Sequence, residues 1–147
     1  MKIESGDLIA AATIIVGFGV TVIMFRVQRE LWVQEQHPDW PSWLAWSDYL
    51  IIASVVLALF LAIVPLLAVS VMTSLVQALA AASCVAAVIL QAGYIPAILA
   101  HYRIEIGRKR KGDRLKGEPA ERRFVFISAA LATVGFIIVL WTHLRAA

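Results

Sequence analysis

The stretch from Tyr49 to Ala100, YLIIASVVLALFLAIVPLLAVSVMTSLVQALAAASCVAAVILQAGYIPAILA, has 52 residues and no aspartate, glutamate, lysine or arginine. As one straight helix it would be about 78 Å long, more than twice the roughly 30 Å hydrocarbon thickness of a membrane. It must therefore fold back on itself. Pro65 and the small hydroxyl residues that follow it make the one central helix-breaking region, so we predict the turn between Pro65 and Ser74.

Two further apolar segments flank this stretch. Leu8–Phe25 has 18 uncharged residues and Phe124–Leu144 has 21, each enough for one membrane-spanning helix. The sequence therefore predicts an all-α fold, an integral membrane four-helix bundle with four transmembrane helices in a single transmembrane domain, 1–147. We place the spans at about 8–26, 45–66, 73–101 and 122–144 and cytoplasmic loops at 27–44 and 102–121. The first and third helices are expected to extend past the bilayer over 28–36 and 103–111.

The composition excludes several classes of protein. With 61% hydrophobic and 16% charged residues among 147, the chain is too apolar for a water-soluble monomer. A single cysteine, Cys84, excludes an intrachain disulfide and a cysteine-based zinc site within one chain. No serine–histidine–aspartate set, HExxH motif or carboxylate pair at one depth is present. We therefore predict no catalytic residues, no metal and no cofactor, and no nucleic-acid partner.

Basic residues predict the orientation of the chain. Arg26 and Arg29 follow the first span, and nine more lysines and arginines lie between the third and fourth, so 11 of the 13 fall on one side of a four-span protein. Basic loops stay in the cytoplasm, which places both termini outside. We expect a multi-pass protein of the cell membrane, specifically a bacterial inner membrane.

The loop before the fourth span is polybasic. Basic residues beside an anionic leaflet each contribute about 1 kcal/mol of attraction, so topology and contact with lipid headgroups account for this loop. Regulation by a phosphoinositide-like or nucleotide ligand is the alternative. The residues predicted to bind anionic lipid are Arg103, Arg108, Lys109, Arg110, Lys111, Arg114 and Lys116.

Each predicted span carries small or uncharged polar residues along one face. In the third they recur every seven residues, an advance of about 700°, or about 20° short of two full turns, so they form one narrow stripe. The third has Ser70, Gln77, Cys84 and Gln91; the fourth has Ser128, Gly135 and Thr142; the first has Thr13, Gly17 and Thr21; and the second has Ser54, Ala58 and Ala62.

Two hypotheses explain these faces. Helix–helix packing accounts for the first, second and fourth spans, because small residues allow close approach and hydroxyls bond across helices. The two glutamines of the third span are more polar than tight packing requires and indicate either a lined, narrow wet path or a ring of hydrogen bonds between subunits. Helix–helix packing is the alternative for this span as well. The residues of the third and fourth spans are accordingly predicted to line a pore or an interface.

These faces cannot all be satisfied within one small bundle, so we expect a homo-oligomer or docking to other membrane subunits. The function predicted first is a homo-oligomeric channel or pore-like assembly with the third helix nearest its axis. The alternative is a non-conducting accessory or assembly subunit of a larger membrane complex. A membrane-embedded enzyme is the third possibility.

The enzyme hypothesis comes from layout. Four spans in about 150 residues with both termini outside resemble the membrane-associated glutathione and eicosanoid enzymes. Members of that family hold a thiol ligand through arginine, asparagine and glutamate on the second span. Here Ile51–Leu67 offers Ser54 as its one polar side chain. The resemblance is therefore confined to layout.

The predicted orientation is testable with single cysteines in a Cys84→Ser background. A membrane-impermeant thiol reagent should label Ala147→Cys in intact cells and Arg110→Cys only after permeabilisation, because the polybasic loop is expected in the cytoplasm. Labelling of both positions from the same side would contradict the four-span topology.

Overall fold

The computed structural model describes residues 4–38, 45–68, 73–102 and 118–146. The helices of this described part are α1 (Ser5–Gln36), α2 (Asp48–Ala58), the π-helical turn η1 (Leu59–Ile63), α3 (Val64–Ala68), α4 (Ser74–His101) and α5 (Glu118–Ala146). α2, η1 and α3 follow one another without a break and form one span. Four helices are therefore long and apolar enough to cross a membrane, and the prediction of an all-α, four-span protein is confirmed.

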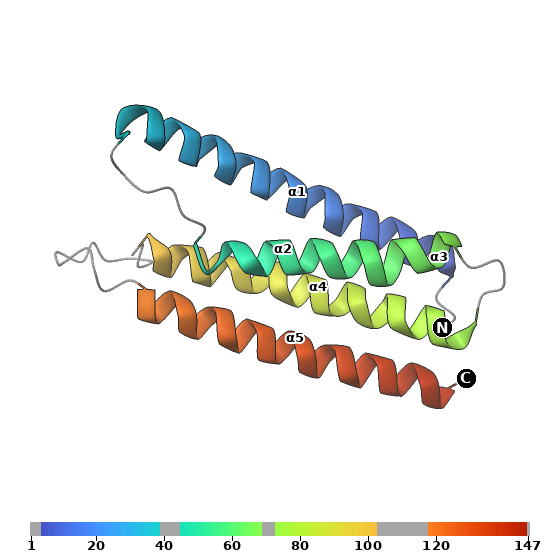
Figure 1. Ribbon diagram of the computed structural model, residues 1–147. Helices are drawn as coiled ribbons and strands as arrows, with labels where there is room; N and C mark the ends of the chain where they lie inside the picture. The colour runs from blue at the N-terminus through green and yellow to red at the C-terminus, as the bar shows by residue number, and fades with distance from the viewer. Residues whose placement is uncertain (1–3, 39–44, 69–72, 103–117, 147) are drawn as a thin grey trace.

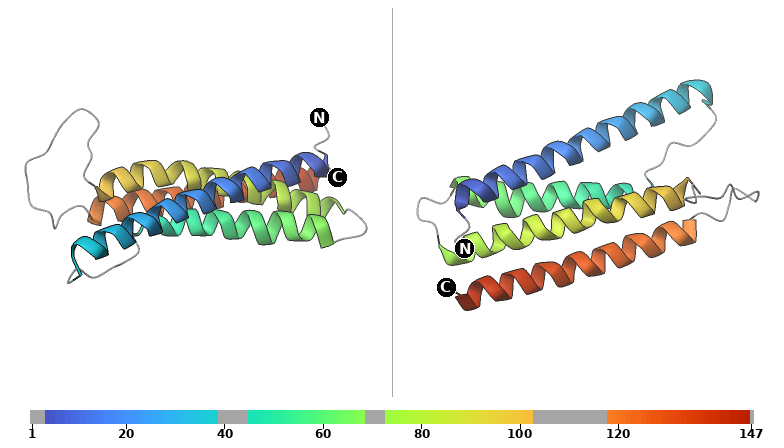
Figure 2. Two further views of the ribbon diagram at one scale, coloured as in Figure 1. Left: turned by 90° about the horizontal axis from the view of Figure 1, so that it is seen from above. Right: turned by 180° about the vertical axis from the view of Figure 1, so that it is seen from behind.

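α4 lies at the centre of the bundle, and the other three spans pack around it (Figures 1 and 2). In its most apolar window, 50% of the α4 residues are buried, against 22% for α1 and 17% for α5. The start of α1 and the end of α5 lie at the same end of the bundle (Figure 1). That this end faces the outside of the cell stays a prediction.

The helix ends follow from local sequence. Thr73 caps α4, because its side-chain oxygen accepts from the backbone N–H of Val76 at 3.3 Å. α5 begins with Glu118 and Pro119, and proline is favoured in a first helical turn, where its missing N–H costs nothing. α1 continues to Gln36, as expected. The expected extension of the third helix over 103–111 lies outside the described residues.

The second span contains a widened turn directly before its proline. η1 spans Leu59–Ile63, and Pro65 follows in α3. A proline ring clashes with the carbonyl four residues before it, here Leu61, and offers that carbonyl no N–H. A π turn at this position accommodates both effects without ending the helix. The chain then reverses between Ala68 and Ser74, within the interval predicted from the sequence.

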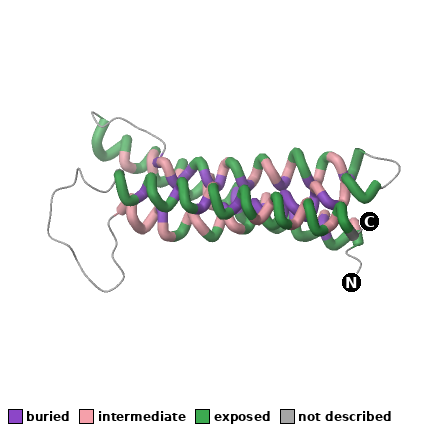
Figure 3. The backbone as a smooth tube through the Cα atoms, turned by 90° about the horizontal axis from the view of Figure 1, so that it is seen from below, coloured by how far each residue is buried: buried purple, intermediate pink, exposed green. Residues whose placement is uncertain are grey.

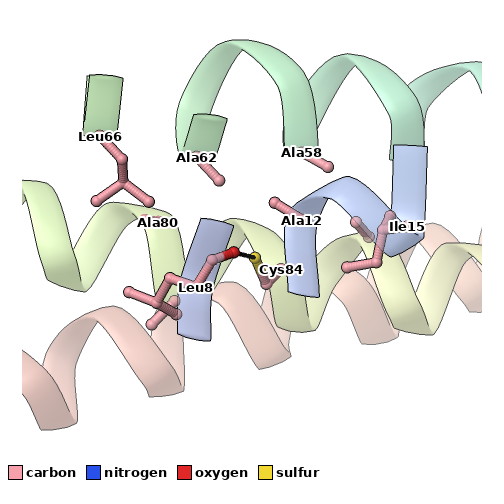
Figure 4. Packing of buried hydrophobic residues seen from close by; sticks show 10 residues of the cluster. Leu8, Ala12, Ile15, Ala58, Ala62, Leu66, Ala80 and Cys84 are labelled. Atoms are coloured by element: carbon pink, nitrogen blue, oxygen red, sulfur yellow. Dashed lines mark hydrogen bonds between the residues drawn. The ribbon is translucent and has the colours of Figure 1, made fainter. Parts of the chain in front are cut away.

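Alanine is the commonest residue of the buried core along the axis of the bundle, whereas the outward turns are exposed (Figure 3). One cluster joins the first half of α1 to the second span and α4 (Figure 4). Its members are Leu8, Ala12, Ile15, Ala58, Ala62, Leu66, Ala80, Ala81, Cys84 and Ala87. Alanines bring the helix backbones close together, which is how transmembrane helices gain packing contact.

The α4–α5 contact is closest at Gly93. A Cβ atom built on Gly93 would overlap the Oγ and Cβ of Ser128, whereas one on Gly17 of α1 meets nothing within 4 Å. Ser128 is itself buried, and its hydroxyl donates to the carbonyl of Phe124 at 2.7 Å. Any side chain at Gly93 must therefore push α5 away from α4.

This contact predicts different effects at two adjacent positions of α4. Gly93→Ala should lower the free energy of unfolding by about 1–3 kcal/mol, the usual cost of overpacking, whereas Ala92→Leu, at an exposed position, should change it by less than about 0.5 kcal/mol. SDS titration in mixed micelles, followed by circular dichroism, measures both. Ser128→Gly combined with Gly93→Ala should recover part of the loss; equal stability of the two single variants would contradict the close contact.

Candidate functional site

A buried ion pair joins α1 to α2 where both helices leave their apolar segments. Arg26 Nε donates to Asp48 Oδ1 at 3.0 Å, and its Nη2 donates to Oδ2 at 3.1 Å. This is the two-pronged geometry that a planar guanidinium and a carboxylate favour. The side chains are 12% and 7% exposed. Asp48 also accepts from the backbone N–H of Ala45 at 3.1 Å, so its charge is held from two directions.

The cluster extends to the end of α4 through Tyr102. Arg26 and Arg29 both donate to the Tyr102 hydroxyl, and the Arg29 guanidinium lies 4.4 Å from the centre of its ring. Burial raises the pKa of Tyr102, against the lowering effect of the two arginines. The phenol therefore stays protonated at neutral pH, and its oxygen acts as the acceptor. Glu30 Oε1 completes the cluster at 3.1 Å from Arg26 and 3.4 Å from Arg29.

A second buried carboxylate ties α5 to the rest of this end. Glu121 is fully buried, and its Oε1 accepts from the backbone N–H of Ser47 at 2.7 Å. Its Oε2 lies 2.9 Å from His101 Nδ1. The Ser47 hydroxyl is buried and is the one side-chain polar atom of the described residues that is buried without a hydrogen-bond partner. Glu121 thereby connects the starts of α2 and α5 with the end of α4.

A groove of about 450 Å³ lies between α1 and α2 at this end of the bundle. It is found where α1 diverges from the other helices toward its C-terminal end (Figures 1 and 2). Arg26 and Asp48 line it where they pair, and aliphatic residues make most of the rest. The lining is Val22, Ile23, Arg26, Val27, Glu30, Leu31 and Gln34 of α1 with Asp48, Ile51 and Ile52 of α2.

Deeper in the bundle, Gln91 makes its hydrogen bonds within the chain. Its Nε2 donates to the carbonyl of Ile15 at 2.8 Å and to Ser54 Oγ at 3.2 Å. Ser54 is buried and donates in turn to the carbonyl of Ile51 at 2.8 Å. Gly19 lets α1 and α2 lie this close together, since a Cβ atom at this position would overlap a methyl group of Val55. One glutamine thus links α4 to both α1 and α2.

The other residues predicted to line a pore or an interface fall into three groups. Cys84 is buried beside the carbonyl of Leu8, which its sulfur approaches at 4.0 Å (Figure 4). Ser128 and Gly135 face α4, and Gln77 is half-buried. Thr142 is exposed and bonds to the carbonyl of Val139, whereas Ser70 lies outside the described residues. Two members of the α4 stripe, Cys84 and Gln91, therefore face other helices of the same chain.

The predicted anionic-lipid residues, Arg103, Arg108, Lys109, Arg110, Lys111, Arg114 and Lys116, all lie outside the described residues. Contact of this loop with lipid headgroups stays a prediction.

Neither the ion pair nor the buried glutamate is predicted from the sequence, where Arg26 serves as an orientation signal and Glu121 has no assigned role. A signal for the first did exist: Arg26 directly follows one apolar segment and Asp48 directly precedes the next. Two charges at matching boundaries of successive spans lie at the same depth and can pair.

Comparison of the chain with family models, curated proteins and solved structures finds no match. Among the described residues there is also no group of three histidine, cysteine, aspartate or glutamate side chains placed to hold a metal ion. Function must therefore be argued from the geometry itself.

The ion pair predicts an asymmetry between two arginines. Asp48→Asn should destabilise the protein by about 1–3 kcal/mol, because the largely buried Arg26 guanidinium loses its two-pronged carboxylate partner and keeps Glu30 and the Tyr102 hydroxyl. Arg29→Gln, at a side chain that is 48% exposed, should cost less than about 1 kcal/mol. The double variant Arg26→Met, Asp48→Leu should be more stable than Asp48→Asn. SDS unfolding measures all three, and a similar small effect for both single variants would contradict a buried pair.

Proposed function

We propose that this chain is a non-conducting assembly subunit of the membrane, which associates with a second copy through the outward face of α1. The observation that carries the proposal is a line of small residues on that face. Gly6, Ala10, Thr13, Gly17 and Thr21 are all exposed. At about 100° per residue they lie opposite Leu8, Ala12, Ile15 and Gly19, which are buried in the bundle.

This face is suited to close approach. A Cβ on Gly6 or on Gly17 would meet nothing within 4 Å. The hydroxyls of Thr13 and Thr21 donate to the carbonyls of Ile9 and Gly17, at 2.8 Å each, so they present their methyl groups without an unsatisfied donor. Small residues spaced four apart let two transmembrane backbones meet at van der Waals distance.

A second copy is the partner that this face fits best. Two identical faces of small residues are complementary to one another across a two-fold axis, as in an isologous dimer. A bulky foreign helix would leave gaps over Gly17. The proposal thus keeps the homo-oligomer expected from the sequence. It places the contact between copies on the first span instead of the third.

The same geometry favours a subunit over a channel. A pore lined by the third span needs Cys84 and Gln91 at an axis between copies. Cys84 is buried, and Gln91 bonds to α1 and α2 within one chain. The exposed side of the same stretch of α4 offers Val85, Val88 and Ile95, which are aliphatic. A dimer formed through α1 brings no polar face of α4 to its axis.

The proposal predicts the oligomeric state of three variants. In a Cys84→Ser background, Gly17→Cys should form a disulfide-linked dimer in the native membrane on oxidation. Gly17→Leu should convert the detergent-solubilised dimer to a monomer, since a leucine holds the two helices apart. Ala130→Leu, on the exposed face of α5, is the matched control and should leave the dimer intact. Light scattering with chromatography measures the masses.

A flux assay separates this proposal from the channel hypothesis. The purified protein in liposomes should pass no ions or small solutes. Conductance that Gln77→Leu or Gln91→Leu alters would instead support a pore lined by α4. A monomeric parent protein, or a dimer indifferent to Gly17→Leu, would overturn the assignment of the interface.

A further inference from the structure

The groove between α1 and α2 is separate from the proposed dimer contact, because its lining on α1 begins at Val22, beyond Thr21, the last residue of that contact. We propose that it binds one membrane phospholipid whose zwitterionic headgroup carries a primary ammonium, as in phosphatidylethanolamine.

The position of the groove matches the depth of a lipid headgroup. Its lining on α1 runs from Val22 to Gln34, about 18 Å along a helix at 1.5 Å per residue. The uncharged segment of the first span ends at Phe25, and that of the second begins at Tyr49. The lining therefore crosses the boundary between hydrocarbon and headgroups.

One end of the groove is apolar and the other is polar, as are the acyl chains and the headgroup of a lipid. On the hydrocarbon side the walls are Val22, Ile23, Ile51 and Ile52. On the headgroup side they include Glu30 and Gln34. Val27 and Leu31 are 44% and 55% exposed, so the groove is open along α1. An acyl chain from the bilayer can enter from the side without leaving an apolar environment.

The charges of the groove select the headgroup. Its ionisable lining is one guanidinium and two carboxylates, a net charge of −1. The Arg26 guanidinium donates to Asp48 through two of its nitrogen atoms. Among the described residues, both ion pairs of Glu30 are made by its Oε1 atom. The other oxygen of Glu30 is left for a donor. A primary ammonium supplies charge and N–H groups together.

Arg29 provides the complementary charge for the phosphate. It pairs with Glu30 at 3.4 Å, is 48% exposed, and stands outside the groove lining. A headgroup with an ammonium and a phosphate can therefore meet a carboxylate and a guanidinium side by side at the rim. A purely anionic headgroup, such as phosphatidylglycerol, can also offer its phosphate to Arg29, but it has no ammonium for Glu30 and adds negative charge beside a lining of net −1.

The test is lipid photo-crosslinking by the full chain in vesicles of equimolar phosphatidylethanolamine and phosphatidylglycerol. The crosslinking side chain replaces Ile52 in the groove or, as a control, Ile127 on the exposed face of α5. Mass spectrometry gives the ratio of the two adducts at each position. The ratio of phosphatidylethanolamine to phosphatidylglycerol should be about two- to fivefold higher at Ile52, the factor that one partly exposed ion pair supplies.

Two matched variants assign the selectivity to the carboxylate. Glu30→Gln should bring the ratio at Ile52 to that at Ile127. Glu35→Gln removes the same charge from the outward face of α1 and should leave the ratio unchanged. Val27→Trp should lower the total lipid adduct at Ile52 by filling the groove, a readout that does not depend on the headgroup.

Three outcomes would overturn the proposal. Equal ratios at Ile52 and Ile127 would mean that the groove takes bulk lipid without selection. Enrichment of phosphatidylglycerol, or equal enrichment when phosphatidylcholine replaces phosphatidylethanolamine, would exclude a primary ammonium as the recognised group. An adduct at Ile52 to the protein's own chain instead of to lipid would show that the groove is covered from within.

Discussion

Contact between small side chains holds this bundle together, because lipid removes the usual reason for apolar helices to associate. Hydrocarbon tails are as apolar as leucine, so burying a leucine between two spans gains little, and association depends on close packing. α4 meets this constraint with alanine: seven of its ten buried residues are alanines. Gly93 and Gly19 extend the same principle to α5 and α1. α4 can lie at the centre of the bundle because its small side chains let other helices approach it on several sides.

Polar atoms obey the same constraint in a different way. Within the hydrocarbon they are few and are paired inside the chain, as Gln91 is with Ile15 and Ser54. At the boundary they are ionisable side chains paired between helices, as Arg26 is with Asp48 and Glu121 with His101.

The sequence predicts the fold well because charge is so expensive in lipid. Three uncharged runs and one central proline define four spans, and each corresponds to a helix long and apolar enough to cross the membrane. The seven-residue recurrence likewise places Cys84 and Gln91 on one face of α4. What periodicity cannot supply is the neighbour that this face meets. The face is predicted from the sequence to lie at an axis between copies, whereas Cys84 contacts α1 and Gln91 contacts α1 and α2 within one chain.

The site at the end of the bundle was harder to predict for a related reason. Glu121 meets Ser47 and His101, which lie 74 and 20 residues away. No local pattern distinguishes it from an ordinary acid at a helix start. The groove depends on the divergence of α1 from α2, and no residue type encodes an angle between helices. The sequence predicts how deep a residue lies in the membrane and which face of its helix it occupies. Which neighbouring helix that face contacts depends on how the helices pack.

The Arg26–Asp48 pair also bears on how the protein is made. The two residues belong to consecutive spans and are 22 positions apart, so both emerge from the ribosome before α4 does. The first hairpin can thus neutralise its own buried arginine as it enters the bilayer, with no help from later segments. Tyr102 and Glu30 join a pair that is already formed. Biogenesis can therefore proceed by inserting a charge-balanced hairpin onto which α4, and then α5, assemble.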